Sequence, residues 1–235
     1  MIVLRSALFW LALLLFTPPY AIIALASAPL PRIVRYRIIS GWSRLMLWCL
    51  RALCGIRWTI EGRGHLPATP SVILSKHQSA WETLAFQHIF PPQVHVLKRE
   101  LLWLPFFGWG LALMSPIAID RGRGLSALRQ IARRGKVRLE QGFWVVVFPE
   151  GTRVKPGEHR KYRLGGAWLA AHAGVPVVPV AHNAGRVWPR NSFLKYPGRV
   201  TVRIGPPIQS AGRDAQTINA MAEEWIETQQ KTLDN

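Results

Sequence analysis

The sequence contains few acidic residues: 12 Asp and Glu stand against 30 Lys and Arg among 235 residues, which gives a formal net charge of +18. So large a positive charge attracts nucleic acids, anionic lipid headgroups and acidic proteins alike, and charge alone does not choose among them. The chain is also 49% hydrophobic and contains 11 Trp, whose rings favour the membrane–water interface. This composition favours a protein of a lipid surface over a soluble nucleic-acid-binding protein.

Cysteine is scarce as well. Cys49 and Cys54 lie in an apolar segment at a spacing that matches neither a CxxC motif nor a zinc site. A disulfide framework and a thiolate metal site are therefore not indicated, and we interpret both residues as small hydrophobic side chains. Six histidines outside the motif described below show no metal-ligand spacing: His65, His88, His95, His159, His172 and His182. We interpret them as structural or surface residues, and we single out His182 because it follows an apolar run directly.

The N-terminal segment has no charged residue between Arg5 and Arg32. Its length is sufficient to cross a bilayer. However, Pro18-Pro19 near its middle removes backbone hydrogen bonds and predicts that a helix kinks or ends there. We therefore expect two short helices in a hairpin rather than one clean span, followed by a basic linker over residues 32–37.

Residues 38–53 have the pattern of a helix that lies in the plane of the membrane interface. Arg44 and Arg51 share a polar stripe on an otherwise apolar helix, where they would reach anionic headgroups. Two alternatives remain open. Ala26-Ser27-Ala28 resembles the cleavage site of a signal peptide, and the two helices could also be an ordinary buried pair.

From residue 56 onward, short β-branched runs alternate with helical stretches. The predicted strands are 57–61, 72–75, 94–97, 116–119, 144–148, 177–181 and 200–204, and the predicted helices are 80–89, 125–141, 165–173 and 215–231. This alternation predicts the α/β class, with a mixed, largely parallel central sheet flanked by helices and an active site beyond the strand C-termini. We divide the chain into a membrane element, 1–54, and a catalytic domain, 55–235.

A histidine follows the predicted strand 72–75, and a carboxylate follows it one helical turn later. In this arrangement His77 could act as a general base and Glu82 could orient its ring, which is the pair that acyl transfer to an alcohol needs. The alternative is local, because Ser79-Ala80-Trp81-Glu82 matches the capping box that begins a helix. If Glu82 is only a cap, Glu150 is the next candidate to orient His77.

The predicted strand 144–148 leads into Phe148-Pro149-Glu150-Gly151-Thr152-Arg153. Here a carboxylate, a glycine and an arginine again follow a strand, and the planar fork of Arg153 is well suited to hold a phosphate. A surface turn at Pro-Glu-Gly with a solvated arginine is the alternative.

Together these two segments resemble the glycerolipid acyltransferase family, specifically the 1-acylglycerol-3-phosphate acyltransferases. The family's H-x4-D block is matched at 77–82, with Glu82 in place of the usual aspartate, and its F-P-E-G-T-R block is matched letter for letter at 148–153. Segments 98–101, 105–109 and 119–121 resemble the block associated with the acceptor phosphate, and 175–180 resembles the last, apolar block. The resemblance covers about 56–208, and the family's two-helix membrane element corresponds to 1–54.

The resemblance implies an O-acyltransferase that moves a fatty acyl chain to the sn-2 hydroxyl of 1-acylglycerol-3-phosphate, giving phosphatidic acid. It implies His77 as the base, Glu82 as its orienting acid, and direct transfer without an acyl-enzyme. The chain has no G-x-S-x-G nucleophile motif, which agrees with this. Lys98, Arg121 and Arg153 would hold the phosphate, and Glu150, Gly151 and Thr152 complete the expected substrate-binding set. Backbone N–H groups near Gly151 and at a helix start are both options for the oxyanion donor.

The expected partners are membrane lipid, lysophosphatidic acid and acyl-CoA or acyl-carrier protein as co-substrate, with no cofactor, no metal and no nucleic acid. The expected location is the cytoplasmic face of the inner membrane. An apolar stretch over 101–114 could line a tunnel for the acyl chain or simply pack in the core. Two other functions stay open: acylation of another lyso-lipid, such as lyso-ornithine lipid, and membrane-associated nucleic-acid binding.

Overall fold

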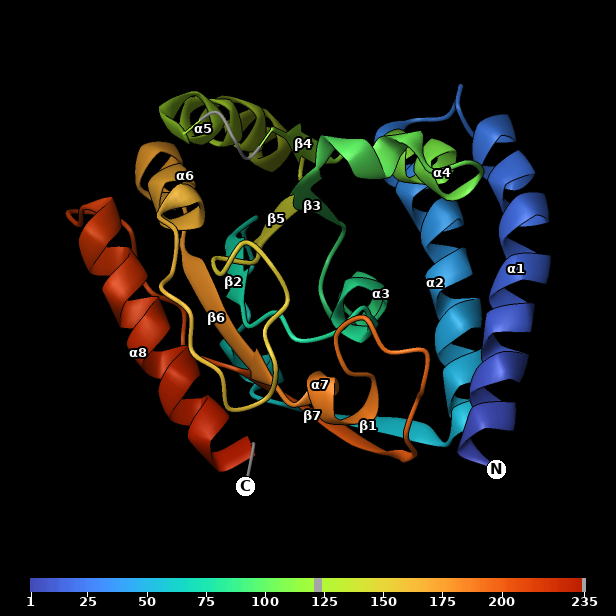
Figure 1. The fold of residues 1–235 in the computed structure, drawn as a ribbon. Coiled ribbons are helices and arrows are strands. Elements are labelled where there is room, and N and C mark those ends of the chain that lie inside the picture. The colour runs from blue at the N-terminus through green and yellow to red at the C-terminus, as the bar shows by residue number, and fades with distance from the viewer. Residues whose placement is uncertain (121–123, 234–235) are drawn as a thin grey trace.

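The computed structural model describes residues 1–120 and 124–233 and has the layered α/β arrangement that the alternating pattern predicts (Figure 1). The strands are β1 (Ile56–Glu61), β2 (Val72–Ser75), β3 (Gln93–Lys98), β4 (Ile117–Ile119), β5 (Trp144–Val147), β6 (Val177–His182) and β7 (Gly198–Ile204). The helices are α1 (Ile2–Ala26), α2 (Arg32–Cys54), α3 (Trp81–Ile89), α4 (Phe107–Leu113), α5 (Gly124–Glu140), α6 (Gly165–Ala173), α7 (Ala184–Val187) and α8 (Ala215–Leu233), with 3-10 turns η1 (Arg63–His65) and η2 (Arg99–Trp103).

The seven strands form one sheet in the order β1-β7-β6-β2-β5-β3-β4, and every neighbouring pair is parallel except β6 with β7. The predicted mixed, largely parallel sheet is therefore confirmed. Helices cover both faces of the sheet: α2 and α3 lie on one side, and α5, α6 and α8 lie on the other (Figure 1). Such double coverage explains why the central strands read as continuous apolar runs.

Strand β2 shows how the two layers share the sheet. Val72, Ile73 and Leu74 are all fully buried, and alternate side chains enter different cores. Ile73 packs in the core that includes α2 and α3, whereas Val72 and Leu74 pack in the core that includes α6 and α8. This period of two is the ordinary geometry of a strand.

Helix α1 corrects the expectation of a break at Pro18-Pro19. The helix is continuous from Ile2 to Ala26 with both prolines inside it. Packing against α2 offsets the lost hydrogen bonds: Tyr20 donates to the carbonyl of Ile38, and the indole of Trp42 donates to Thr17. A proline inside a helix costs about 3 kcal/mol, which tertiary contacts can outweigh.

The second correction concerns residues 32–37, which form the beginning of α2 and not a linker. Pro31 ends the preceding turn and stands at the N-cap of α2, a position where a missing N–H does no harm. The two long helices then run antiparallel, with the α1–α2 turn at the upper edge of the molecule (Figure 1).

Helix α4 was not predicted. Its sequence contains Gly108 and Gly110, and glycine is a weak helix former. The structure explains Gly108, because a Cβ at this position would collide with the backbone carbonyl of Leu102. Glycine is therefore required at position 108 by its contact with the Leu102 backbone, and helix propensity does not indicate this contact.

Much of the apolar surface of α1 is exposed. Leu4, Leu14 and Ile22 are each at least 65% exposed, and only 22% of the most apolar window of α1 is buried. Among the described residues, α1 is the one helix long and apolar enough to cross a membrane. An apolar surface of this extent is covered by lipid or a partner in a stable protein, and here it indicates membrane association.

Candidate active site

The C-terminal ends of β2 and β5 bring the two motif segments together. These strands are parallel neighbours, with Leu74 in register with Val147. Residues 76–82 and 148–153 therefore leave the sheet at the same edge, as expected for the site of an open parallel sheet.

His77 and Glu82 meet directly. Their Nδ1 and Oε1 atoms are 2.8 Å apart, and the Glu82 side chain is fully buried whereas 13% of the His77 side chain is exposed. A carboxylate only accepts hydrogen bonds, so His77 donates from Nδ1, and its Nε2 is left as the basic nitrogen.

The same carboxylate oxygen also has the predicted capping role. Oε1 of Glu82 accepts the backbone N–H groups of Gln78 at 3.0 Å and Ser79 at 2.8 Å. The two interpretations of Glu82 are thus compatible: hydrogen bonds within the turn hold the carboxylate in the place where it meets His77. The glutamate side chain thus reaches the ring of His77.

The pKa values of this pair suit general-base chemistry. Burial lowers the pKa of His77 below its ordinary value and outweighs the opposing effect of Glu82, so the ring is neutral at pH 7. Burial disfavours the Glu82 anion, but the His182 and His77 rings and the Ser79 N–H outweigh it and lower the pKa of Glu82.

Aromatic stacking fixes the plane of the His77 ring. Phe148, the first residue of the second motif, stacks on it with ring centres 4.0 Å apart and planes within 14°. Phe148 also stacks with His95 at 6.1 Å, and burial lowers the pKa of His95 to about 4. The sequence analysis did not connect His95 with the site, because no spacing links it to His77.

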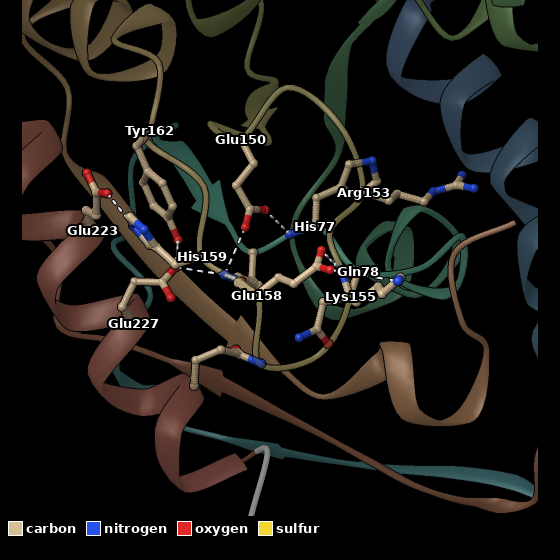
Figure 2. A network of polar contacts seen from close by, with 12 residues as sticks. His77, Gln78, Glu150, Arg153, Lys155, Glu158, His159, Tyr162, Glu223 and Glu227 are labelled. Carbon is tan, nitrogen blue, oxygen red and sulfur yellow. Dashed lines mark hydrogen bonds and ion pairs between the residues drawn. The ribbon is translucent and has the colours of Figure 1, made fainter.

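Glu150 contacts the backbone of the turn that holds His77. Its Oε2 accepts the backbone N–H of His77 at 2.7 Å, and its Oε1 pairs with the ammonium of Lys76 at 2.9 Å (Figure 2). Glu150 therefore contacts the backbone of His77, while Glu82 contacts its ring.

The fully buried side chain of Lys76 belongs to a polar network whose other members include Glu150, Tyr162 and Glu227 (Figure 2). Its ammonium pairs with Glu227 of α8 at 2.9 Å, and Tyr162 donates to that same carboxylate at 2.8 Å. Although burial opposes it, the carboxylates of Glu150 and Glu227 hold the pKa of Lys76 above its ordinary value. Burial raises the pKa of Glu150 to about 7 against the attraction of Lys76.

His182 lies beneath the same turn. Its Nδ1 accepts the N–H of Ala184, so its Nε2 donates to the carbonyl of Lys76 at 2.9 Å. Gln230 of α8 in turn donates to the carbonyl of His182. His182, which we singled out in the sequence, therefore supports the backbone of the turn that holds His77.

Removal of the Lys76 ammonium should destabilise the fold. Lys76→Met leaves the buried carboxylate of Glu150 beside Glu227 without a cation, and loss of one partner from a buried ion pair costs about 3–5 kcal/mol. At about 2–4 °C per kcal/mol for a chain of this size, the thermal unfolding midpoint should fall by roughly 10 °C.

Circular dichroism of the detergent-solubilised protein measures this midpoint. Lys155→Met is the matched control, because the Lys155 side chain is 76% exposed and its contact with Glu158 is long at 3.9 Å. An unchanged midpoint in Lys76→Met would show that the network does not contribute to stability.

A cavity of about 400 Å³ begins at His77 and extends toward the helical hairpin. Its wall includes four basic side chains: His77, Lys98, Arg153 and Arg190. The remainder is mostly apolar and includes Ala24, Ile39, Trp42, Leu111 and Met114. The basic side chains can therefore hold an anionic group near a base, and the apolar wall can hold a hydrocarbon chain.

The structure brings some of the predicted substrate-binding residues to this cavity. Lys98, Thr152 and Arg153 line it, whereas Glu150 and Gly151 are absent from its wall among the described residues. Gly151 has a φ of 71°, a conformation that favours glycine, and its N–H donates to the carbonyl of Phe148. That N–H is therefore engaged within the turn. Arg121 lies outside the residues that the structure describes.

Arg190 is a basic residue that the sequence analysis missed. It lies in the segment after α7, and its guanidinium donates to the carbonyl of Arg153 at 2.8 Å. The fold brings these two arginines together from positions far apart in the chain.

The predicted tunnel over 101–114 agrees in part with the cavity wall. Leu101, Phe106, Phe107 and other residues of this segment line the cavity. Trp103 is 72% exposed and faces away from the core. Helices α1 and α2 contribute the rest of the wall, which local sequence did not indicate.

Within 1–120 and 124–233 there is no group of three or more His, Cys, Asp or Glu side chains placed to hold a metal ion.

Comparisons with known proteins identify the family of the chain. The family model described as Acyltransferase matches residues 57–183. The chain is 45% identical over 228 residues to the 1-acyl-sn-glycerol-3-phosphate acyltransferase of Pseudomonas aeruginosa, which covers 95% of this chain and 89% of that protein. It is 34% identical over 184 residues to the mouse 1-acyl-sn-glycerol-3-phosphate acyltransferase alpha, covering 77% of this chain and 65% of the mouse protein. The crystal structure of the 1-acyl-sn-glycerophosphate acyltransferase PlsC from Thermotoga maritima has the same fold, with a TM-score of 0.83, 21% identity and coverage of 99% and 95% of the two chains.

Proposed function

The chain belongs to the acyltransferase family, and from that premise we propose that it acylates the free hydroxyl of 1-acyl-sn-glycerol 3-phosphate to give phosphatidic acid for phospholipid biosynthesis. The observation that carries this proposal is that His77, paired with Glu82, lines the same largely apolar cavity as Lys98 and Arg153. A lysophosphatidic acid has the matching parts: a hydroxyl, a phosphate and a long chain.

The reaction requires one proton to move twice. Nε2 of His77 removes the proton of the acceptor hydroxyl while its oxygen attacks the carbonyl carbon of the thioester. Glu82 stabilises the imidazolium that forms and keeps its ring in place. When the tetrahedral intermediate collapses, the carbon–sulfur bond breaks, and the imidazolium returns the proton to the departing thiolate. The products are an ester and a free thiol.

Phosphate binding positions the hydroxyl. We assign the phosphate to Lys98 and Arg153, with Arg190 as an additional donor at the same end of the cavity. A guanidinium holds two phosphate oxygens in a fixed direction, and fixing the phosphate limits where the neighbouring hydroxyl can lie. Thr152 is a further wall residue, whereas Glu150 and Gly151 act through the turn that presents His77.

The N-terminal helices belong to the substrate site as well as to the membrane element. We keep 1–54 as that element and 55–235 as the catalytic domain, but Thr17, Ala21 and Trp42 line the same cavity as His77. The acyl chains would leave the bilayer between α1, α2 and α4. Because acyl-CoA and acyl-carrier protein are water-soluble donors made in the cytoplasm, we place the site at the cytoplasmic face of the inner membrane.

Arg153→Ala tests the phosphate assignment. A charge-assisted hydrogen bond to phosphate contributes about 1.5–3 kcal/mol, so kcat/KM for 1-acylglycerol-3-phosphate should fall roughly 10- to 100-fold. The rate with monoacylglycerol, which has no phosphate, should change little. Arg190→Ala should act in the same direction but less strongly, because its side chain lies at the exposed rim.

Arg160→Ala is the control for this experiment, since Arg160 is an exposed arginine of the same loop and is not in the cavity wall that the described residues form. Equal losses with both acceptors in Arg153→Ala would rule out its role in phosphate recognition.

A further inference from the structure

Four arginines gather beside the α1–α2 turn, away from His77. Arg32 and Arg35 come from the beginning of α2, and Arg134 and Arg138 come from α5. We call this set the guanidinium cluster. Among the described residues, none of the four lies in the wall of the catalytic cavity.

The segment 113–118 holds three of these side chains together. Arg138 donates from Nε to the carbonyl of Ser115 at 2.8 Å, and Arg134 donates to the carbonyl of Ala118 at 3.3 Å. Arg35 donates to the carbonyl of Leu113 at 2.7 Å and reaches the hydroxyl of Ser115 at 3.5 Å. Ser115 has a φ of 61°, which is unusual outside glycine. It contacts both Arg35 of α2 and Arg138 of α5.

The acceptors of the guanidinium cluster are neutral. They are backbone carbonyls, the Ser115 hydroxyl and the side-chain amide oxygens of Gln141 and Gln130. Within the described part of the chain, no carboxylate forms an ion pair with any of the four. Burial and the charges of Arg32, Arg134 and Arg35 lower the pKa of Arg138, so the four guanidinium groups repel one another.

Such a cluster favours an anion that offers several oxygens. Guanidinium groups have five donors each, and the neutral acceptors named above use only part of them. Phosphate presents strong acceptors to two or more arginines at once and relieves the repulsion among them.

The position of the cluster identifies the source of that phosphate. The α1–α2 turn, α4 and α5 lie together along the upper edge of the molecule (Figure 1). Exposed apolar side chains occur on the same elements, including Leu25 on α1, Leu30 in the turn and Trp109 on α4. Arginines next to exposed apolar and aromatic side chains are typical of a surface in contact with lipid headgroups.

We propose that the guanidinium cluster of Arg32, Arg35, Arg134 and Arg138 is a binding site for the phosphate headgroup of an anionic membrane phospholipid, separate from the catalytic cavity. This site fixes the height and rotation of the hairpin relative to the bilayer surface. It does not depend on which lipid is acylated.

Vesicle binding tests the proposal. Full-length protein is titrated with vesicles of phosphatidylcholine alone and with vesicles that also contain phosphatidylglycerol. The cluster variant is Arg134→Gln with Arg138→Gln. The matched control is Arg129→Gln with Arg133→Gln, which removes the same charge from exposed positions of the same helix.

The cluster variant should lose roughly tenfold or more of the affinity that phosphatidylglycerol adds, and the control should lose about threefold or less. Equal losses in the two variants would overturn the proposal, because they would show that α5 attracts anionic membranes through diffuse charge. Equal binding of the wild type to vesicles with and without phosphatidylglycerol would also overturn it, in favour of a free-anion site.

Folding is checked by acyl transfer in a non-ionic detergent, where the cluster variant should match the wild type. If Arg134→Gln with Arg138→Gln fails to fold, Arg32→Gln with Arg134→Gln replaces it, because fewer backbone contacts are lost. Arg32→Gln with Arg134→Gln should again lose roughly tenfold or more of the affinity that phosphatidylglycerol adds, against about threefold or less for the control.

Discussion

Replacement of His77 by glutamine lowers the rate of acyl transfer by about a thousandfold or more, because general-base catalysis contributes roughly 10²–10⁴. Glutamine keeps a polar side chain of similar reach beside Glu82 and Phe148, so the turn should survive. Transfer from labelled acyl-CoA and from labelled acyl-carrier protein to 1-acylglycerol-3-phosphate measures the effect and identifies the donor.

The pH dependence of the wild type should have a definite sign. The base is the neutral ring, and the pKa of His77 lies below its ordinary value of 6.5. As the pH falls through that lowered pKa, the ring becomes protonated and kcat/KM falls, and above it kcat/KM reaches a plateau. In His77→Gln this acid limb should disappear from the residual activity.

His172→Gln is the control, since His172 contacts only Trp168 of its own helix and lies outside the cavity wall of the described chain. Near-normal activity in a folded His77→Gln protein would contradict the proposed base.

Replacement of Glu82 by glutamine should cost about 10²–10⁴ in rate. The amide would present an N–H to Nδ1 of His77 in some orientations, which would invert the ring tautomer and remove the basic Nε2. It would also weaken the acceptor for the N–H groups of Gln78 and Ser79. The rate with both donors measures the first effect, and the thermal unfolding midpoint measures the second.

The expected loss of rate is much larger than the expected loss of stability, and this difference separates a catalytic role of Glu82 from a helix cap. A lost cap costs about 1 kcal/mol, which lowers the unfolding midpoint by only about 2–4 °C. Glu82→Asp supplies a shorter carboxylate and should restore part of the rate. Glu223→Gln on α8 is the control, because Glu223 pairs with the surface residue His159. A large drop in stability with a normal rate per folded molecule would reduce Glu82 to a cap.

The sequence predicted those parts of the site that lie within a few residues of each other. His77 and Glu82 are five residues apart on a strand-to-helix turn, and Phe148 to Arg153 is continuous, so local pattern and resemblance both detected them. The seven strands were also predicted within one or two residues at most ends, because each is a short apolar run bounded by turn residues.

The parts that were missed depend on contacts between distant segments. Arg190 reaches Arg153 across 37 residues, and the upper part of the cavity wall comes from helices that precede the catalytic domain. The break expected at Pro18-Pro19 was wrong because the packing of α1 on α2 is stronger than the local penalty. None of these facts can be read from a window of neighbouring residues.

The ion pair between Lys76 and Glu227 joins residues 151 positions apart. Lys76 immediately precedes His77, whereas Glu227 lies on α8, which is the last helix of the described chain. During synthesis, the segment with His77 leaves the ribosome well before Glu227, and Glu150 is the first of the two carboxylates available to pair with Lys76. The contact that joins α8 to this turn forms only afterwards, when α1 and α2, which precede the turn in the chain, have already left the ribosome.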